Sequence, residues 1–455
     1  MPAVKICIVG GGSPYMTSMF ASLARFAKNG ALKNSEIIIY DINGENALLM
    51  AEWGKQAASR EKIPLKFFVR EKLDRALDGS DFVLSTFRTG GLDGRYLDET
   101  IPEKFRELGI ETVGVGGIFM ALRCIPEVAH LARQIRKNCP KAWLINYTNP
   151  TSMVTAVSLR EGHERSLGLC DGVYGVKWLI CKLLKIPTNR AGEVEAFVSG
   201  VNHCTWALKI FHRGRDLYEE GLLEKLIEKA DLSASAGYQS EAGEQLDEVQ
   251  VDAIRLYRYY GILPGSVYYT RYYYALRKTL EHHLAPGFQH RSEWLKELGA
   301  KKRQEIKGQL KNKRASISAH DVEDSAHGDQ AIGVLNDVAN DTRRLEVVNV
   351  RNQGAVPNLP EDAVVEVTCA LGSNGALPIA AGPLPFALQG IVRSVHESAT
   401  LAVEAGLTGN RKLVLQAAMA HPAHRDFDTI EKVIAELFEA HRPWLPQFFK
   451  KGAKK

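Results

Sequence analysis

The first 28 residues run in the order strand, glycine-rich turn, helix, and this order constrains the fold more than any other feature of the chain. Val4 to Val9 is a short apolar run rich in β-branched residues, and Gly10, Gly11 and Gly12 follow it directly. Thr17 to Lys28 then has helical spacing. Glycines let a backbone approach a pyrophosphate, and a helix N-terminus offers it free N–H groups. The pattern predicts an α/β fold that begins with a Rossmann-like, doubly wound sheet.

A second apolar run, Glu36 to Tyr40, ends in Asp41. A carboxylate at this place accepts hydrogen bonds from the ribose hydroxyls of NAD and repels a 2′-phosphate. We therefore predict that NAD binds to Gly10, Gly11, Gly12, Ser13 and Asp41. Tyr15 stands where the full G-x-G-x-x-G motif has its third glycine, so a tight turn without a nucleotide is the alternative.

Two more predicted strands end in polar residues. Asp81 to Thr86 leads to Arg88, and Ala142 to Tyr147 leads to Asn149. In open α/β sheets the ligand lies beyond the carboxyl ends of the strands, so both side chains are candidates for contact with substrate or cofactor. An asparagine before a proline is also a common turn former, which is the alternative interpretation of Asn149.

A thiol and an imidazole follow this predicted sheet. Cys170 comes directly after Gly168-Leu169, and His203 stands between the predicted strands Val194 to Val198 and Ala207 to Phe211. Together they suit a metal ion, and a metal together with a dinucleotide suggests redox chemistry on a hydroxyl group. A buried cysteine is more often a small core residue, and a single histidine is more often structural.

Charge and cysteine content exclude several classes of function. The formal net charge of +5 is too small a bias to indicate nucleic acid binding. Seven cysteines show no disulfide framework, no signal peptide precedes the first strand, and no apolar run approaches the roughly 20 residues needed to cross a bilayer. We therefore expect a cytoplasmic protein without a membrane or nucleic acid partner.

The length of 455 residues and a change of pattern near residue 200 predict two domains. Residues 1–200 would form the NAD-binding domain, and residues 201–455 an α+β domain for substrate, metal and oligomerisation. The second domain should contain a strand at Val364 to Ala370. Its expected helices are Glu248 to Tyr260, Val267 to Leu284, Thr400 to Ala420 and Thr429 to Ala440.

In this order the motifs resemble family 4 glycoside hydrolases, the NAD- and metal-dependent glycosidases, nearly from end to end. The blocks that carry the resemblance include Val9 to Ser13, Arg88 to Gly91, Arg95, Asp98 to Pro102, Glu111 to Gly117, Ala121 to Pro126, Thr148 to Pro150, Gly168 to Asp171, Asn202-His203, Pro264, Tyr269 to Tyr274 and Asn349 to Pro385. The resemblance implies a sheet arranged as in lactate and malate dehydrogenases. It also implies a homodimer or homotetramer.

The resemblance assigns roles to residues of this chain. Cys170 and His203 match the family's metal ligands, with Mn²⁺ as the expected ion. Asp171 matches a candidate general acid, and Tyr269 matches the candidate base, with Tyr268 and Tyr272 as alternatives. Asn149 is expected to contact both cofactor and substrate. The expected substrate-binding residues are Arg88, Arg95, Asn149, Glu111 and Arg271.

The implied reaction is hydrolysis of a glycosidic bond by way of a transient oxidation. The sugar is oxidised at C3, deprotonated at C2, loses its C1 substituent, gains water and is reduced again, so that NAD is regenerated in each turnover. An α-glycoside with an anionic C6 group, either phosphate or the sulfonate of a sulfoquinovoside, is the expected substrate. The alternatives are an unmodified α-glucoside, α-galactoside or α-galacturonide. A plain NAD-dependent sugar or 2-hydroxyacid dehydrogenase and a nucleotide-binding regulator also stay open.

Overall fold

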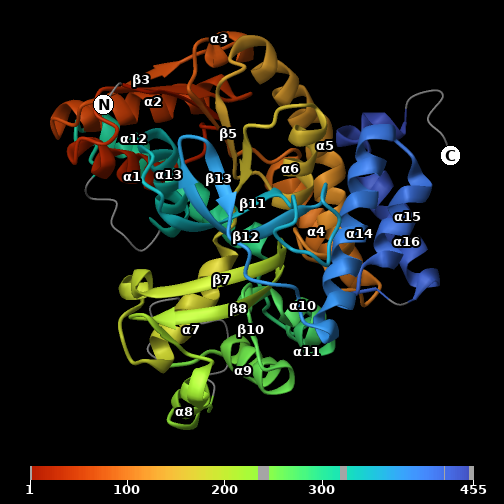
Figure 1. The fold of residues 1–455 in the computed structure, drawn as a ribbon. Coiled ribbons are helices and arrows are strands. Elements are labelled where there is room, and N and C mark those ends of the chain that lie inside the picture. Colours follow the sequence, from red (N-terminus) through yellow and green to blue (C-terminus); the bar gives the residue numbers. More distant parts are fainter. Residues whose placement is uncertain (1–2, 234–244, 318–324, 425, 450–455) are drawn as a thin grey trace.

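The first strand lies inside a nine-stranded sheet in the computed structural model, which describes residues 3–233, 245–317, 325–424 and 426–449 (Figure 1). Six parallel strands follow the order β6-β5-β4-β1-β2-β3, the usual order of a dinucleotide-binding sheet. They are β1 (Lys5–Val9), β2 (Ser35–Tyr40), β3 (Leu65–Val69), β4 (Phe82–Ser85), β5 (Trp143–Asn146) and β6 (Ser166–Gly168). The predicted α/β fold is confirmed.

Alternating side chains of β1 anchor the two faces of this sheet. Ile6 and Ile8 belong to the core beneath α1 and α2, whereas Cys7 belongs to the core on the opposite face. This two-residue period is what a strand buried on both faces requires. The helices of this half are α1 (Met16–Lys28), α2 (Gly44–Arg60), α3 (Leu73–Leu77), α4 (Gly91–Lys104), α5 (Gly114–Asn138) and α6 (Thr151–Arg160).

Three strands from the second half of the chain extend the same sheet. β11 (Leu345–Arg351) pairs with β6 in the antiparallel direction, with Asn349 opposite Gly168. β12 (Val364–Gly372) and β13 (Gly375–Pro378) continue outward from it. The domain division at residue 200 stays a prediction; the large sheet takes strands from both sides of that position.

A smaller antiparallel sheet lies below the large one in Figure 1. It is built from β7 (Val194–Val201), β8 (Cys204–His212), β9 (Arg215–Asp216) and β10 (Leu263–Pro264). Thr368 of β12 joins the two sheets, because its hydroxyl accepts a hydrogen bond from the Val198 N–H (2.9 Å) and donates one to the Ala196 carbonyl (3.0 Å).

Helices cover the remaining surfaces of both sheets. α7, α8 and α9 pack on the small sheet, and α14, α15 and α16 pack on α4, α5 and α6. Their bounds, with those of the other helices, are η1 (Asp171–Val173), α7 (Tyr174–Leu183), η2 (Thr188–Glu193), η3 (Glu219–Gly221), α8 (Leu222–Glu228), α9 (Glu248–Tyr260), η4 (Val267–Tyr269), α10 (Arg271–Tyr274), α11 (Leu276–His283), α12 (Arg291–Lys311), α13 (Ser325–Asn340), α14 (Phe386–Thr408), α15 (Arg411–Ala420), α16 (Phe427–Ala440), η6 (Arg442–Trp444) and η7 (Pro446–Phe448).

Two predicted helices are interrupted. The segment 267–284 divides into η4, α10 and α11 because its tyrosines pack into different cores: Tyr268 joins the core beneath the small sheet, and Tyr272 joins a separate cluster. The segment 400–420 breaks at Gly409, which ends α14 with a φ of 73°. Tertiary packing and a left-handed glycine therefore override the helical spacing of the sequence.

Among the described residues, one helix is long and apolar enough to cross a membrane, judged by length and composition alone. It is α5, and 83% of its apolar stretch is buried inside the protein. The core helix of a globular protein meets the same criterion. We therefore interpret α5 as a core helix, although the expectation that no apolar run approaches spanning length does not hold for it.

Candidate active site

The glycine-rich turn folds back over the end of β2. The N–H groups of Gly10 and Gly11 both donate to the Tyr40 carbonyl, at 2.9 and 3.1 Å. The Gly12 N–H donates to Asp41 Oδ2 (2.9 Å), and a Cβ on Gly12 would lie 2.8 Å from that oxygen. The predicted cofactor residues thus form one cradle that only glycines permit.

Asp41 and Ser13 also make local contacts in this cradle. Asp41 Oδ1 accepts a hydrogen bond from the Asn43 N–H (2.8 Å), and Ser13 Oγ accepts one from the Tyr15 N–H (3.3 Å). Both residues are only partly buried. The turn and its carboxylate therefore remain accessible at the carboxyl edge of the sheet, which is where a dinucleotide binds in this fold.

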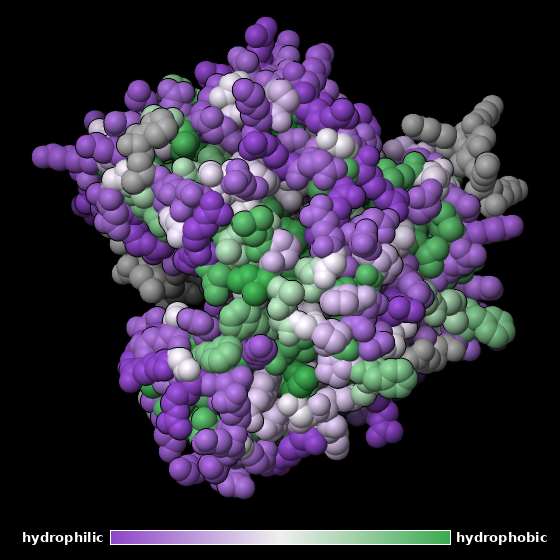
Figure 2. All heavy atoms as spheres, in the orientation of Figure 1, coloured by the Kyte–Doolittle hydropathy of each residue, from purple (hydrophilic) through white to green (hydrophobic). Residues whose placement is uncertain are grey.

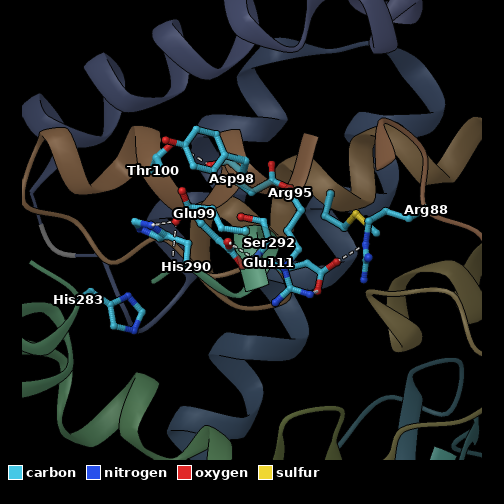
Figure 3. A network of polar contacts seen from close by, with 12 residues as sticks. Arg88, Arg95, Asp98, Glu99, Thr100, Glu111, His283, His290 and Ser292 are labelled. Atoms are coloured by element: carbon cyan, nitrogen blue, oxygen red, sulfur yellow. Dashed lines mark hydrogen bonds and ion pairs between the residues drawn. The ribbon is translucent and has the colours of Figure 1, made fainter. Parts of the chain in front are cut away.

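Three of the predicted substrate-binding residues form one ionic network (Figure 3). The buried Glu111 carboxylate pairs with Arg88 Nε (2.5 Å) and Arg95 Nη1 (2.7 Å), and Arg95 Nε pairs with Glu99 (2.6 Å). Burial raises the pKa of Glu111, but the charges of Arg88 and Arg95 prevail and hold this pKa below its ordinary value. Arg88 is the more open of the two arginines, with 28% of its side chain exposed against 13% for Arg95.

Cys170 and His203 come together although they lie on different sheets. Cys170 follows β6, and His203 is in the two-residue turn that joins β7 to β8. Cys170 Sγ and His203 Nε2 are 3.3 Å apart, and both residues are buried. His203 has a φ of 65°, a left-handed conformation that suits this tight hairpin turn.

The electrostatics of this pair fit a metal ligand set. Burial lowers the pKa of His203 to about 4, so the imidazole is neutral at physiological pH. Burial and the charges of Glu366 and Asp171 raise the pKa of the Cys170 thiol well above its ordinary value. With a divalent cation bound, the neutral imidazole and the thiol, after loss of its proton, would be the two protein ligands. The 3.3 Å separation of the two atoms would allow one ion to contact both.

Cys170 and His203 are two ligands, fewer than a metal ion needs. Within the described part of the chain, no group of three or more histidine, cysteine, aspartate or glutamate side chains is arranged to hold a metal ion. Water or substrate oxygens would have to fill the remaining coordination positions. Such an open arrangement is typical of catalytic metal sites.

Tyr269 stacks on this pair. Its ring lies parallel to the His203 ring, with centroids 3.6 Å apart and an angle of 7° between the planes. The alternatives lie differently: the Tyr268 hydroxyl accepts a hydrogen bond from Gln250 (3.3 Å), and the Tyr272 hydroxyl accepts one from Arg271 (2.7 Å). Of the three tyrosines, Tyr269 is the one whose ring contacts His203.

The other predicted residues surround the pair at different distances. Asp171 adjoins Cys170 and raises the pKa of both Cys170 and His203 by its charge. Asn149 accepts a hydrogen bond from Thr151 (3.2 Å), whose hydroxyl also donates to the Leu169 carbonyl beside Cys170 (3.1 Å). Arg271 lies over the Tyr272 ring, one ring removed from Tyr269.

The site also contains a buried carboxylate that the sequence did not indicate. Glu366 of β12 is 1% exposed and accepts hydrogen bonds from Asn202 (2.8 Å) and Asn349 (2.9 Å). Burial raises its pKa to about 7, although hydrogen bonding by the two asparagines and the His203 backbone opposes this. The available signal was one acidic residue inside the apolar run Val364 to Ala370.

Comparison with known proteins identifies the family. A model described as family 4 glycosyl hydrolase matches residues 5–186, and a model of that family's C-terminal domain matches residues 198–424. A probable 6-phospho-beta-glucosidase of Bacillus subtilis is 30% identical over 455 residues, which cover 98% of each chain. The chain belongs to glycoside hydrolase family 4. The expected resemblance is confirmed.

Solved structures agree with this family 4 assignment. A 6-phospho-alpha-glucosidase from gut microorganisms, in complex with NAD and Mn²⁺, superposes with a TM-score of 0.85 at 26% identity, covering 98% of this chain and 100% of that one. Lactate dehydrogenase from Eimeria maxima superposes with a TM-score of 0.54 at 16% identity, covering 90% of this chain and 97% of that one. The second likeness concerns the fold alone and confirms the dehydrogenase-like sheet.

Proposed function

We propose that this family 4 enzyme hydrolyses an α-glycoside with an anionic C6 group by the oxidation and elimination sequence described above, with NAD and Mn²⁺ as cofactors. The observation that carries the proposal is the stack of Tyr269 on His203, with Cys170 3.3 Å from the His203 ring nitrogen. This combination of a phenol, an imidazole and a thiol lies on the same edge of the sheet as the glycine-rich turn.

Each residue of the site has a task in this proposal. Gly10, Gly11, Gly12, Ser13 and Asp41 hold the dinucleotide. Cys170 and His203 hold the metal ion, and Asn149 contacts both cofactor and sugar. When bound, NAD takes up and later returns a hydride, and the metal ion polarises the sugar oxygens.

Two residues move protons in this proposal. Tyr269 removes the C2 proton, which requires a phenol whose pKa lies well below about 10. The Arg95 guanidinium is within electrostatic reach of Tyr269, and it favours the phenolate. Asp171, beside the metal pair, donates a proton to the leaving oxygen.

The anionic C6 group is the finer part of the proposal. Arg88 is the more exposed cation of the Glu111 network and is free to turn one edge of its guanidinium toward a phosphate or sulfonate. The two family relatives described above are named for 6-phosphoglucosides, which supports a phosphate. Arg95, Glu111 and Arg271 complete the proposed substrate-binding set.

The test is release of 4-nitrophenol from α- and β-aryl glycosides that are neutral, 6-phosphorylated or 6-sulfonated, with and without NAD⁺ and Mn²⁺ under reducing conditions. We expect release from an anionic α-glycoside that requires both cofactors and leaves no net NADH. Release of 4-nitrophenol from the neutral glycosides only would mean that the substrate is an unmodified α-glycoside. Net NADH without nitrophenol would replace the proposal by a dehydrogenase.

We also propose a cytoplasmic homodimer or homotetramer. All seven cysteines are free and buried, which suits a reducing compartment. Apolar side chains gather across the middle of the face shown in Figure 2, in front of β12, and Leu377 and Phe386 are 50% and 91% exposed. Exposed apolar areas of this kind are typical of subunit contacts. Light scattering during size-exclusion chromatography measures the number of subunits.

A further inference from the structure

A buried carboxylate behind the metal pair has no task in the reaction proposed above. Glu366 belongs to β12, and its side chain is buried. Its Oε1 accepts hydrogen bonds from the side-chain amides of both Asn202 and Asn349. Its Oε2 has no hydrogen-bond partner among the described residues. Burying a charged group is costly, so a carboxylate kept in such a place calls for a compensating charge or a specific role.

The two asparagines connect Glu366 to the segments that contain the two proposed metal ligands. Asn202 precedes His203 in the two-residue turn between β7 and β8. Asn349 lies opposite Gly168, and its amide also contacts the Gly168 carbonyl (3.4 Å), two residues before Cys170. One carboxylate oxygen is therefore connected to the His203 segment on one side and to the Cys170 segment on the other.

The surroundings of Glu366 offer it no balancing charge. Among the described residues, its side-chain hydrogen-bond partners are the neutral amides of Asn202 and Asn349, and no ion pair joins it to a lysine or arginine. A divalent cation held by Cys170 and His203 would be the positive charge that balances this buried carboxylate.

We propose that Glu366 is a positioning residue that fixes the distance between Cys170 and His203 through Asn202 and Asn349, and adds the negative charge that favours a divalent cation there. It does not touch the substrate. Mutation of a residue that supports metal ligands in this way typically lowers metal affinity by 10- to 100-fold. The inference rests on the proposed metal role of Cys170 and His203.

A purely structural role would be attachment of the small sheet to the large one. Thr368, two residues further along the same face of β12, has that role, because its hydroxyl bonds to both Val198 and Ala196 of β7. Thr368→Val removes these bonds without contacting the metal pair. It is therefore the matched control for a variant of Glu366.

The experiment measures Mn²⁺ binding by chelator-treated protein without sugar, from the electron paramagnetic resonance signal of free Mn²⁺, together with the thermal midpoint. We expect Glu366→Gln, which keeps an oxygen acceptor but loses the charge, to bind Mn²⁺ at least about tenfold more weakly. Thr368→Val should lower the thermal midpoint and leave Mn²⁺ affinity within about twofold.

Further variants keep the test decisive. Asn349→Ala breaks the link to the Cys170 segment while the carboxylate stays, and it should also weaken Mn²⁺ binding; it decides the question if Glu366→Gln does not fold. The inference about Glu366 would be wrong if Glu366→Gln left Mn²⁺ affinity unchanged, or if Thr368→Val lowered Mn²⁺ affinity by the same factor. The proposed metal site would not be affected by either result. If Cys170→Ser binds Mn²⁺ as the unaltered protein does, the proposed metal site itself is wrong.

Discussion

Gly172 shows how little space separates the reacting groups at the scale of single residues. A Cβ on this glycine would lie 2.7 Å from Cε2 of Tyr269 and 3.4 Å from Sγ of Cys170. The first distance is shorter than the non-bonded contacts that a Cβ atom makes in real proteins, so the Tyr269 ring or the backbone would have to move. Stacking of Tyr269 on His203 therefore depends on the absence of a side chain at position 172.

Gly172→Ala should lower kcat by about 10²-fold, because a displacement of about 1 Å in a reacting group costs that much. The measurement is steady-state hydrolysis of the best aryl glycoside, with NAD⁺ and Mn²⁺ at saturation. Gly308→Ala is the matched control, since a Cβ at Gly308 meets no atom within 4 Å. A kcat within twofold of the unaltered enzyme for Gly172→Ala would contradict the predicted role of Tyr269.

Asp171→Ala tests the predicted general acid. A proton donor helps a poor leaving group far more than an activated one, so the loss should reach about 10²- to 10⁴-fold for an alkyl glycoside. It should be much smaller for the 4-nitrophenyl glycoside. The measurement compares kcat/KM for the two substrates, and equal losses would exclude Asp171 as the acid.

At the scale of elements, α12 connects the substrate-side network to the nucleotide side. The Ser292 N–H at its start donates to Glu99 (3.0 Å), and both residues are labelled in Figure 3. His283 and His290 both bond to Glu103 of α4, at 2.9 and 2.8 Å. Further along, the Leu295 carbonyl accepts the Tyr15 hydroxyl (3.2 Å). The start of α12 therefore depends on two histidines and two carboxylates.

The attachment of α12 should weaken as pH rises. The hydrogen bond to Glu103 raises the pKa of His290 above its ordinary value, against the effect of burial. A group with a raised folded-state pKa stabilises fully below its unfolded value of about 6.5, and this contribution is lost as pH rises through the folded value. Amide hydrogen exchange across residues 291–311, corrected for intrinsic rates, should be faster at pH 8 than at pH 6.

His290→Gln is the control for this dependence. Glutamine keeps an N–H donor for Glu103 and does not titrate, so the difference between pH 6 and pH 8 should become smaller in residues 291–311. An unchanged difference would mean that the protonation of His290 does not control the attachment.

The sequence predicted elements better than their partners. The strand β1 and the glycine turn at residues 10–12 depend on residues that are adjacent in the sequence. The nucleotide turn could therefore be predicted from this short segment. β12 was predicted as a strand, but its place beside β11 and β7 was not, because alternation does not identify a partner. Glu366 was missed for the same reason: one of its two hydrogen-bond partners, Asn202, is 164 positions away.

A buried ion pair holds distant parts of the whole molecule together. Asp98 of α4 makes two hydrogen bonds to Arg123 of α5, at 2.8 and 2.6 Å, and a third contact with Nε2 of His441 after α16 (3.0 Å). All three side chains have no exposed surface. The Arg123 Nε also donates to the Thr89 carbonyl next to Arg88 (3.0 Å), so this pair supports the substrate-side loop.

Asp98→Asn should lower the free energy of unfolding by about 3–5 kcal/mol, because Arg123 would be left as an uncompensated buried charge. Differential scanning calorimetry would record this as a lower thermal midpoint. Glu436→Gln is the control, since its exposed pair with Lys104 also joins α4 to α16 and should contribute no more than about 1 kcal/mol. Equal decreases of the thermal midpoint in the two variants would contradict the prediction that the buried pair contributes more to stability than the exposed one.

The antiparallel pairing of β6 with β11 has a consequence for synthesis on the ribosome. Because chains emerge from their N-terminus, the first six strands can assemble long before Leu345 is made, and the outer edge of β6 stays open for that time. β6 is only three residues long, so it offers few free backbone groups to a neighbouring nascent chain. A chain released early would carry the nucleotide turn and Cys170 without Glu366, and we expect quality control to remove it before it could act on a sugar.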